Sequence, residues 1–162
     1  MSDLVPARAP VRPVFIDGPE DLGRAMIRHG GQVALRNAGS AGPAYLDGVF
    51  DKRGITLAKS TQPPFVGTRW RLAALPDGAW LMACQNDHDY SLAHHGGALY
   101  LGRQEKGGPI APMQWLFFRA GDRLLIRSRD GRWLGARRGR AVAEPLDGLD
   151  DPAFHWQPEN YW

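Results

Sequence analysis

Three tryptophans recur along this chain at a nearly constant interval, and this recurrence constrains its fold more than any other feature. Trp70, Trp115 and Trp156 are separated by 45 and 41 residues. A second marker stands 25, 25 and 23 residues before them, at Tyr45-Leu46, Tyr90-Ser91-Leu92 and Trp133-Leu134. Two markers that keep one spacing three times indicate an internal repeat.

Each repeat contains four short apolar segments that predict β-strands. They lie near residues 33–35, 45–46, 55–58 and 70–75, then 80–82, 90–92, 98–101 and 115–118, then 124–126, 133–135, 141–143 and 154–156. Twelve short strands without intervening helices are typical of an all-β barrel or sandwich. A closed assembly with pseudo-threefold symmetry buries the apolar face of every repeat and leaves no sheet edge.

Composition agrees with one all-β domain preceded by a short extension. The 162 residues are 43% apolar, and 20 Gly and 13 Pro favour turns over long helices. We expect an N-terminal extension over 1–30, with a proline-rich tail, an apolar run at 14–16 that forms a strand or a plug, and a short helix after Asp17. The repeat-containing domain then covers 31–162, with repeats at about 31–75, 76–120 and 121–160.

Targeting and cysteine usage add little about function. No apolar run could serve as a signal peptide or cross a bilayer, which predicts a cytoplasmic protein, although export without such a signal stays open. Cys84 is the sole cysteine, so no intrachain disulfide can form. Alternation in its strand predicts that Cys84 points inward as a small apolar residue.

The repeats resemble those of the β-trefoil superfamily over residues 31–160. In its ricin-B-type lectin branch, repeats end in Gln-x-Trp and carry a Leu-Asp or Val-Asp step near the second strand. The tryptophan is present here in every repeat, and the glutamine position holds Thr68, Met113 and Phe154. The aspartate step occurs only as Leu46-Asp47, because the equivalent places hold Ala93 and Gly135.

The third repeat is also similar to the fascin-like branch of that superfamily. Asp130-Gly131-Arg132-Trp133-Leu134 matches its Asp-Gly-aromatic-Leu pattern, and Phe154 closes the repeat. The resemblance implies a β-trefoil of three four-stranded repeats. It also implies a binding module, lectin-like or protein-binding, whose ligand the shared turn and core residues do not specify.

A carbohydrate site is predicted in the first repeat. Asp47 could accept hydrogen bonds from two sugar hydroxyls, with Asn37 or Gln62 beside it. Tyr45 or Phe65 could stack on the apolar face of a pyranose. The alternative is that Asp47-Gly48 only forms a turn.

A cluster of imidazoles and carboxylates in the second repeat is a candidate metal site. Its members are His88, Asp87, Asp89 and His94. Neighbouring His94 and His95 should point in opposite directions on an extended chain, so they cannot share one ion. A polar turn between strands is the alternative, and we expect no bound cofactor.

Six arginines between 127 and 140 surround Trp133, and this pattern resembles a nucleic-acid footprint. The net charge of only +3 disfavours nucleic acid as the partner. Trp133 also aligns with the other aromatic markers, which predicts a core or rim position.

No nucleophile, phosphate-loop or dinucleotide motif is present, so no enzyme is predicted. Three functions follow: a lectin-like carbohydrate binder, a protein-interaction module that uses its loops and extension, and a metal-dependent enzyme at the His/Asp cluster. The first is the one we prefer.

Overall fold

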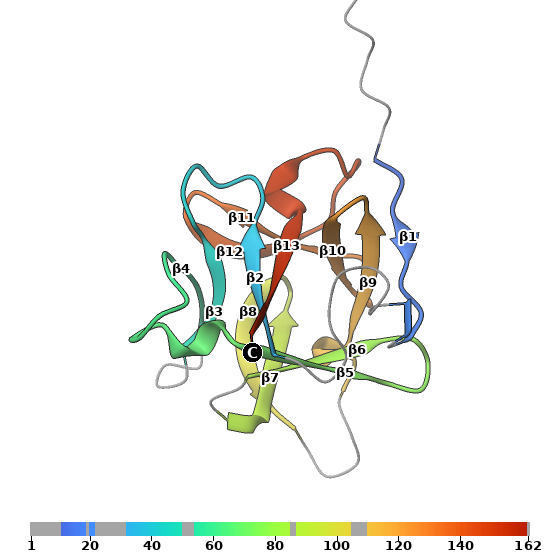
Figure 1. Cartoon of the computed structure of the whole chain (residues 1–162). Coiled ribbons are helices and arrows are strands. Elements are labelled where there is room, and N and C mark those ends of the chain that lie inside the picture. The colour runs from blue at the N-terminus through green and yellow to red at the C-terminus, as the bar shows by residue number, and fades with distance from the viewer. Residues whose placement is uncertain are drawn as a thin grey trace, which may run out of the picture.

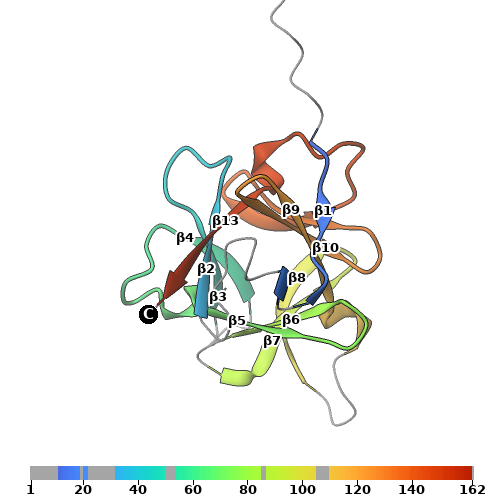
Figure 2. The ribbon, with the colours of Figure 1, turned by 45° about the vertical axis from the view of Figure 1, so that its right-hand side comes forward.

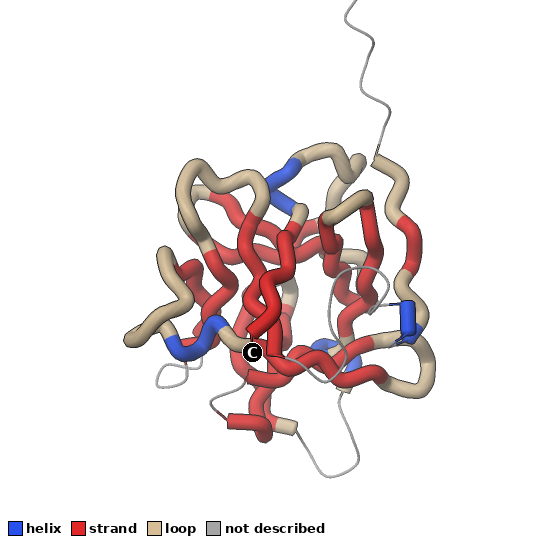
Figure 3. Tube along the Cα trace, viewed as in Figure 1, coloured by secondary structure: helices blue, strands red, loops and turns tan. Residues whose placement is uncertain are grey.

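The computed structural model describes residues 11–18, 20–21, 32–49, 54–84, 87–104 and 110–161. These residues form short antiparallel strands joined by turns and 3-10 helices (Figure 3). The strands are β1 (Val14–Phe15), β2 (Gln32–Asn37), β3 (Tyr45–Val49), β4 (Gly54–Ala58), β5 (Trp70–Ala74), β6 (Trp80–Cys84), β7 (Asp87–His95), β8 (Ala98–Arg103), β9 (Trp115–Ala120), β10 (Arg123–Ser128), β11 (Trp133–Arg137), β12 (Arg140–Glu144) and β13 (Trp156–Tyr161). The 3-10 helices are η2 (Val66–Thr68), η3 (Ala111–Met113) and η4 (Pro152–Phe154).

Six of these strands close into a barrel (Figure 1). Antiparallel pairing runs from β2 through β5, β6, β9, β10 and β13, and β13 pairs again with β2. Each strand of this ring therefore has a partner on both sides. Closure of this kind removes the exposed edges that would otherwise invite association with another chain.

The remaining strands of the repeats form three hairpins that meet one another. They are β3–β4, β7–β8 and β11–β12. Strand β4 also pairs with β8, and β12 contacts both of them. The fold is a β-trefoil, as the sequence predicted.

The three marker tryptophans make the same contact in every repeat. Each indole is fully buried, and its Nε1–H donates to a backbone carbonyl oxygen at 2.9 Å. The accepting residues are Leu46, Leu92 and Leu134. A buried indole N–H needs an acceptor, and here the hairpin strand of the same repeat supplies it.

The structure corrects the alignment of the second marker. Ser91, and not Tyr90, occupies in the second repeat the position of Tyr45 and Trp133. The pairing of β6 with β7 is irregular beside Cys84, and one extra residue moves a side chain to the opposite face of a strand. Tyr90 accordingly packs in the barrel core.

Part of the N-terminal region packs against the barrel (Figure 2). Strand β1 pairs with β9, the Ile16 amide donates to the Phe117 carbonyl oxygen at 2.9 Å, and the Ile16 side chain lies in the core. The apolar run at 14–16 is thus both a strand and a plug. Most of the helix predicted after Asp17 falls at 22–31, outside the described residues.

Two further expectations concern the core and the membrane. Cys84 is buried in the barrel, as its alternation predicted. Among the described residues, no helix has the length and apolar character needed to span a bilayer.

Candidate functional site

One position differs between the repeats in a way that bears on binding. It directly follows the leucine that accepts the indole hydrogen bond, and it is occupied by Asp47, Ala93 and Gly135. The last residue of each 3-10 helix is equivalent too, and it is Thr68, Met113 and Phe154. Within each repeat, one of these residues lies on the hairpin and the other on the 3-10 helix. The pairs are Asp47 with Thr68, Ala93 with Met113, and Gly135 with Phe154.

In the second and third repeats, an apolar side chain fills this position. Met113 packs in a small cluster with Ala93 and Leu81. In the third repeat, a Cβ atom added to Gly135 would lie 2.6 Å from Cε1 of Phe154. The third repeat therefore has no room for a side chain at this place, and in the second the Met113 side chain packs against it.

In the first repeat the equivalent residues are Asp47, which has a carboxylate, and the small residue Thr68 at the end of η2. The Thr68 hydroxyl donates within its own turn to the Phe65 carbonyl oxygen at 2.8 Å. Gly67 lets η2 approach β3 closely, because a Cβ atom at this residue would lie 2.5 Å from Oδ1 of Asp47. Asp47 is consequently only 8% exposed.

Burial raises the pKa of Asp47, and a hydrogen bond with the Thr56 side chain offsets this rise only in part. The two residues are opposite each other on β3 and β4. Among the described residues, no basic side chain contributes to the pKa of Asp47. The carboxylate is therefore poorly solvated, so a hydroxyl donor from a ligand would stabilise it strongly.

Two other residues of the predicted site precede η2 along the chain. Gln62 and Phe65 belong to the β4–β5 loop that leads into η2, and the Phe65 amide donates to the Gln62 carbonyl oxygen at 2.9 Å. The Gln62 side chain is exposed and that of Phe65 is half-buried. Both precede Gly67, the residue whose close approach to β3 covers Asp47.

Asn37 and Tyr45 are instead engaged elsewhere. Asn37 is only 3% exposed; its amide nitrogen donates to the Ala153 carbonyl oxygen at 2.8 Å, and its Oδ1 accepts from the Gly39 amide and the Ser40 hydroxyl. The Tyr45 hydroxyl donates to the Glu159 carboxylate at 3.0 Å. Both side chains connect the first repeat to the C-terminal part of the third.

The candidate metal cluster is not assembled by the residues that the structure describes. The side chains of Asp87, His88 and Asp89 lie outside that part of the structure. In the described ranges, no three His, Cys, Asp or Glu side chains gather as metal ligands. His94 is buried and His95 is exposed, so they point in opposite directions as predicted.

His94 connects the second repeat to the third. Its Nδ1 accepts from the Gly97 amide at 3.4 Å, and its Nε2 lies 3.3 Å from Oδ1 of Asp130. Burial lowers the pKa of His94, and the nearby Asp130 carboxylate opposes that effect. The imidazole is thus a neutral structural bridge.

The arginine-rich segment divides into two parts with different roles. Arg127 lies over the rings of Phe118 and Trp133, at 5.6 and 5.8 Å from their centroids. Arg129 forms an ion pair with Asp77 of the preceding repeat, and Arg132 lies 3.6 Å from Oδ2 of Asp130. These three arginines are structural, and Trp133 is buried at the rim as predicted.

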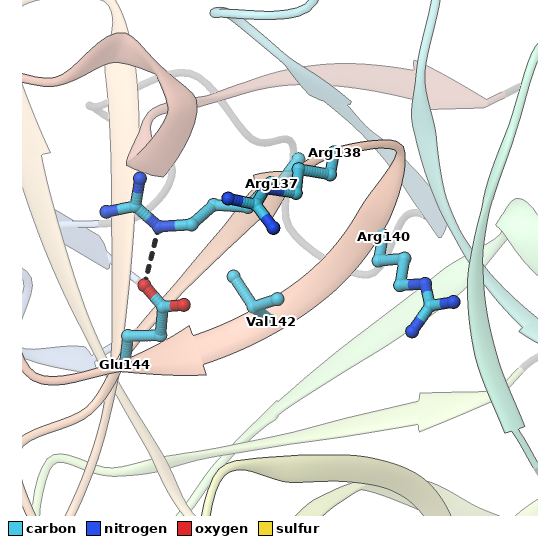
Figure 4. Close-up of a pocket in the computed structure, with 6 residues that line it drawn as sticks. Arg137, Arg138, Arg140, Val142 and Glu144 are labelled. Carbon is cyan, nitrogen blue, oxygen red and sulfur yellow. Dashed lines mark hydrogen bonds and ion pairs between the residues drawn. The ribbon is translucent and has the colours of Figure 1, made fainter.

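The other three arginines line an open pocket of about 810 Å³ on the β11–β12 hairpin (Figure 4). Its lining residues are Ala136, Arg137, Arg138, Arg140, Val142 and Glu144. This pocket was not predicted from the sequence. The available signal was the turn Arg137-Arg138-Gly139-Arg140, whose glycine marks a tight hairpin.

Comparison with known proteins establishes the fold. No family model matches the sequence, and neither does any curated protein. The chain is similar to the GlcNAcα1-4Gal-releasing endo-β-galactosidase from Clostridium perfringens, with a TM-score of 0.70 and 13% identity over 83% of this chain and 33% of that one. It therefore spans about a third of the length of that enzyme.

Two similar structures match over nearly their whole length. The designed three-fold symmetric protein ThreeFoil gives a TM-score of 0.64 at 18% identity, over 81% of this chain and 99% of that one. SeviL, solved bound to asialo-GM1 saccharide, gives 0.63 at 10% identity, over 82% and 98%. These likenesses support the β-trefoil fold and its threefold repetition.

Proposed function

We propose that this domain is a non-catalytic carbohydrate-binding module, and that its first repeat binds a neutral sugar through Asp47, Gln62 and Phe65. The observation that carries the proposal is the contrast between the three equivalent positions. Met113 and Phe154 fill this position in the second and third repeats, whereas the first repeat has a carboxylate, Asp47, with a raised pKa. A poorly solvated carboxylate in a binding module is best explained by a ligand that donates hydrogen bonds to it.

Each residue has a distinct role in this proposal. The Asp47 carboxylate accepts hydrogen bonds from two neighbouring hydroxyls, which sets the orientation of the sugar ring. Gln62 supplies an amide that can donate and accept at the exposed side of the ring. Phe65, which is half-buried, offers an apolar surface for the C–H face of the pyranose.

The structural likenesses support this class of ligand without specifying it. SeviL carries a bound saccharide, and the endo-β-galactosidase acts on a saccharide substrate. The present chain spans about a third of that enzyme, so we propose binding and not hydrolysis.

Binding to a panel of neutral mono- and disaccharides, measured by titration calorimetry, tests the proposal. Asp47→Asn keeps the size of the side chain but removes the charge, so we expect affinity to fall at least tenfold. Phe65→Ala should weaken binding less. Asp122→Asn, at an exposed carboxylate outside the site, is the matched control and should bind normally. Absence of wild-type binding at millimolar sugar, or full affinity in Asp47→Asn, would contradict the proposal.

The second candidate function is binding of a protein partner at β1. Val14 and Phe15 are 58% and 40% exposed, and β1 pairs on only one side among the described strands. Such an edge can accept a further strand from a partner. Because Ile16 belongs to the core, a truncation should remove residues 1–10 and leave 14–16 intact. Val14→Lys then tests the edge itself by capture of partners with intact and variant protein.

A further inference from the structure

The pocket on the β11–β12 hairpin differs from the first-repeat site in charge. Three arginines and a single glutamate surround it, with Val142 and Ala136 as its apolar part. In Figure 4, Arg137 extends toward Glu144, while Arg138 and Arg140 stand on opposite sides of the hairpin tip. The lining of the pocket is therefore mainly positively charged, with a small apolar part.

Arg137 is held in one orientation. Its Nε donates to Oε2 of Glu144 at 2.6 Å, and its guanidinium carbon lies 4.9 Å from the centroid of the Phe154 ring. Glu144 takes up only the Nε–H group, so the two terminal amino groups of this guanidinium keep donors for a ligand. The Phe154 ring, which occupies the space beside Gly135, thus also contacts the Arg137 guanidinium.

Arg138 and Arg140 have no such partner. Within the described ranges, neither guanidinium takes part in an ion pair or a side-chain hydrogen bond. This distinguishes them from Arg127, Arg129 and Arg132, which the fold uses internally. Two exposed and unpaired guanidinium groups beside a fixed third one form a receptor for an oxyanion.

The backbone at the hairpin tip favours a ligand role for Arg138. This turn has two central residues, Arg138 and Gly139, with φ angles of 52° and 74°. The equivalent turn of the second repeat is Gly96-Gly97, with φ angles of 57° and 93°. An arginine in a conformation that suits glycine is strained, and such strain is concentrated at functional positions.

We propose that this pocket binds the sulfate or carboxylate group of an acidic saccharide. Arg138 and Arg140 contact the anionic group directly, Arg137 completes the wall, and the sugar ring packs on Val142. A volume of about 810 Å³ exceeds that of an isolated anion and suits one or two sugar rings. Nucleic acid is disfavoured because Trp133 is buried and offers no face for base stacking.

The inference shares with the proposed function only the premise that the ligand is a saccharide. The two sites lie on different repeats and differ in charge, so they can fail separately. Asp47→Asn should weaken binding of neutral sugar at least tenfold and leave binding of acidic sugar intact. The arginine variants should do the reverse.

Titration calorimetry with a heparin-derived tetrasaccharide, its fully desulfated counterpart and trigalacturonate separates sulfate from carboxylate recognition. Arg138→Gly relieves the strained turn, so this variant should fold at least as well as the wild type while losing affinity about tenfold or more. Arg140→Gln should lose a similar amount. Arg71→Gln, an exposed arginine on β5, removes the same charge elsewhere and should bind normally.

Several results would overturn the inference. Equal losses in Arg71→Gln and Arg138→Gly would show a general effect of charge and no specific site. Failure of both heparin-derived tetrasaccharides and of trigalacturonate to bind the wild type would exclude an acidic saccharide as the ligand. Tighter binding of a single-stranded oligonucleotide than of either acidic saccharide, lost in Arg138→Gly, would assign the pocket to a different ligand.

Discussion

The first and third repeats surround the same backbone geometry with two different sets of side chains. In the first, a carboxylate lies beneath a small threonine and beside an exposed loop. In the third, Gly135 contacts the ring of Phe154. The polar side chains of this repeat are instead the arginines on the β11–β12 hairpin. The barrel tolerates both because its core ends at the buried leucine that accepts the indole hydrogen bond. Binding chemistry can therefore change repeat by repeat without a change of fold.

Transfer of the carboxylate from the first repeat to the third should have the largest effect. Gly135→Asp forces a Cβ atom to within 2.6 Å of Cε1 of Phe154 and buries a charge, so we expect unfolding free energy to fall by about 3 kcal/mol or more. Urea denaturation measures this loss. Gly148→Asp, at a glycine with open space around it, should change stability by less than about 0.5 kcal/mol.

The paired variant Gly135→Asp/Phe154→Thr recreates the combination found in the first repeat. It should be more stable than the sum of the two separate changes predicts, because the threonine leaves room for the aspartate. Simple additivity would mean that the two repeats do not share the geometry described here.

The reverse change, removal of the carboxylate from the first repeat, should be neutral or stabilising near pH 7. The pKa of Asp47 is raised above its usual 3.8 in the folded state, so the fold favours the protonated acid. Ionisation therefore lowers stability progressively as the pH rises above about 3.8. Asp47→Asn removes this penalty, and its advantage over the wild type in urea should grow between pH 3.5 and pH 7. A variant that is less stable at pH 7 than at pH 3.5, relative to the wild type, would contradict the assignment.

The second repeat provides the smallest test, through His94. Its pKa is lowered below the usual 6.5 by burial, so the fold favours the neutral imidazole. Stability is complete above about pH 6.5 and declines as the pH falls through that value, because the unfolded state binds the proton more tightly. Asp130, Arg132 and His95 are the charged or titratable groups that act on it. We expect the urea midpoint of the wild type to drop between pH 7.5 and pH 5.5, and His94→Gln to show a smaller drop.

The periodic features of the fold could be predicted because they repeat three times. The indole spacing and the four strands per repeat follow from a pattern that a single strand could not establish, and the inward position of Cys84 follows from alternation within its strand. The alignment of Tyr90 with Tyr45 was wrong by one residue, because a local irregularity beside Cys84 leaves no mark in the apolar pattern.

The candidate site was harder to predict, since it depends on contacts between distant segments. Asn37 resembles a sugar ligand in sequence, yet Ala153, more than a hundred residues away, takes its amide hydrogen bond. Conversely, four of the six arginines of the basic segment contact other side chains of the fold, whereas Arg138 and Arg140 have no ion-pair partner among the described residues. Only the packing of the repeats separates these two groups.

The pairing of β2 with β13 has a consequence for connectivity. Gln32 and Tyr161 are directly opposite each other in that ladder, so a short linker could join them and turn residues 32–161 into a ring. Opening the ring at the exposed Gly121 turn would start the chain with the third repeat instead of the first. Every native strand pair within this ring would survive such a permutation. The order of the repeats along the chain is thus independent of their arrangement around the axis.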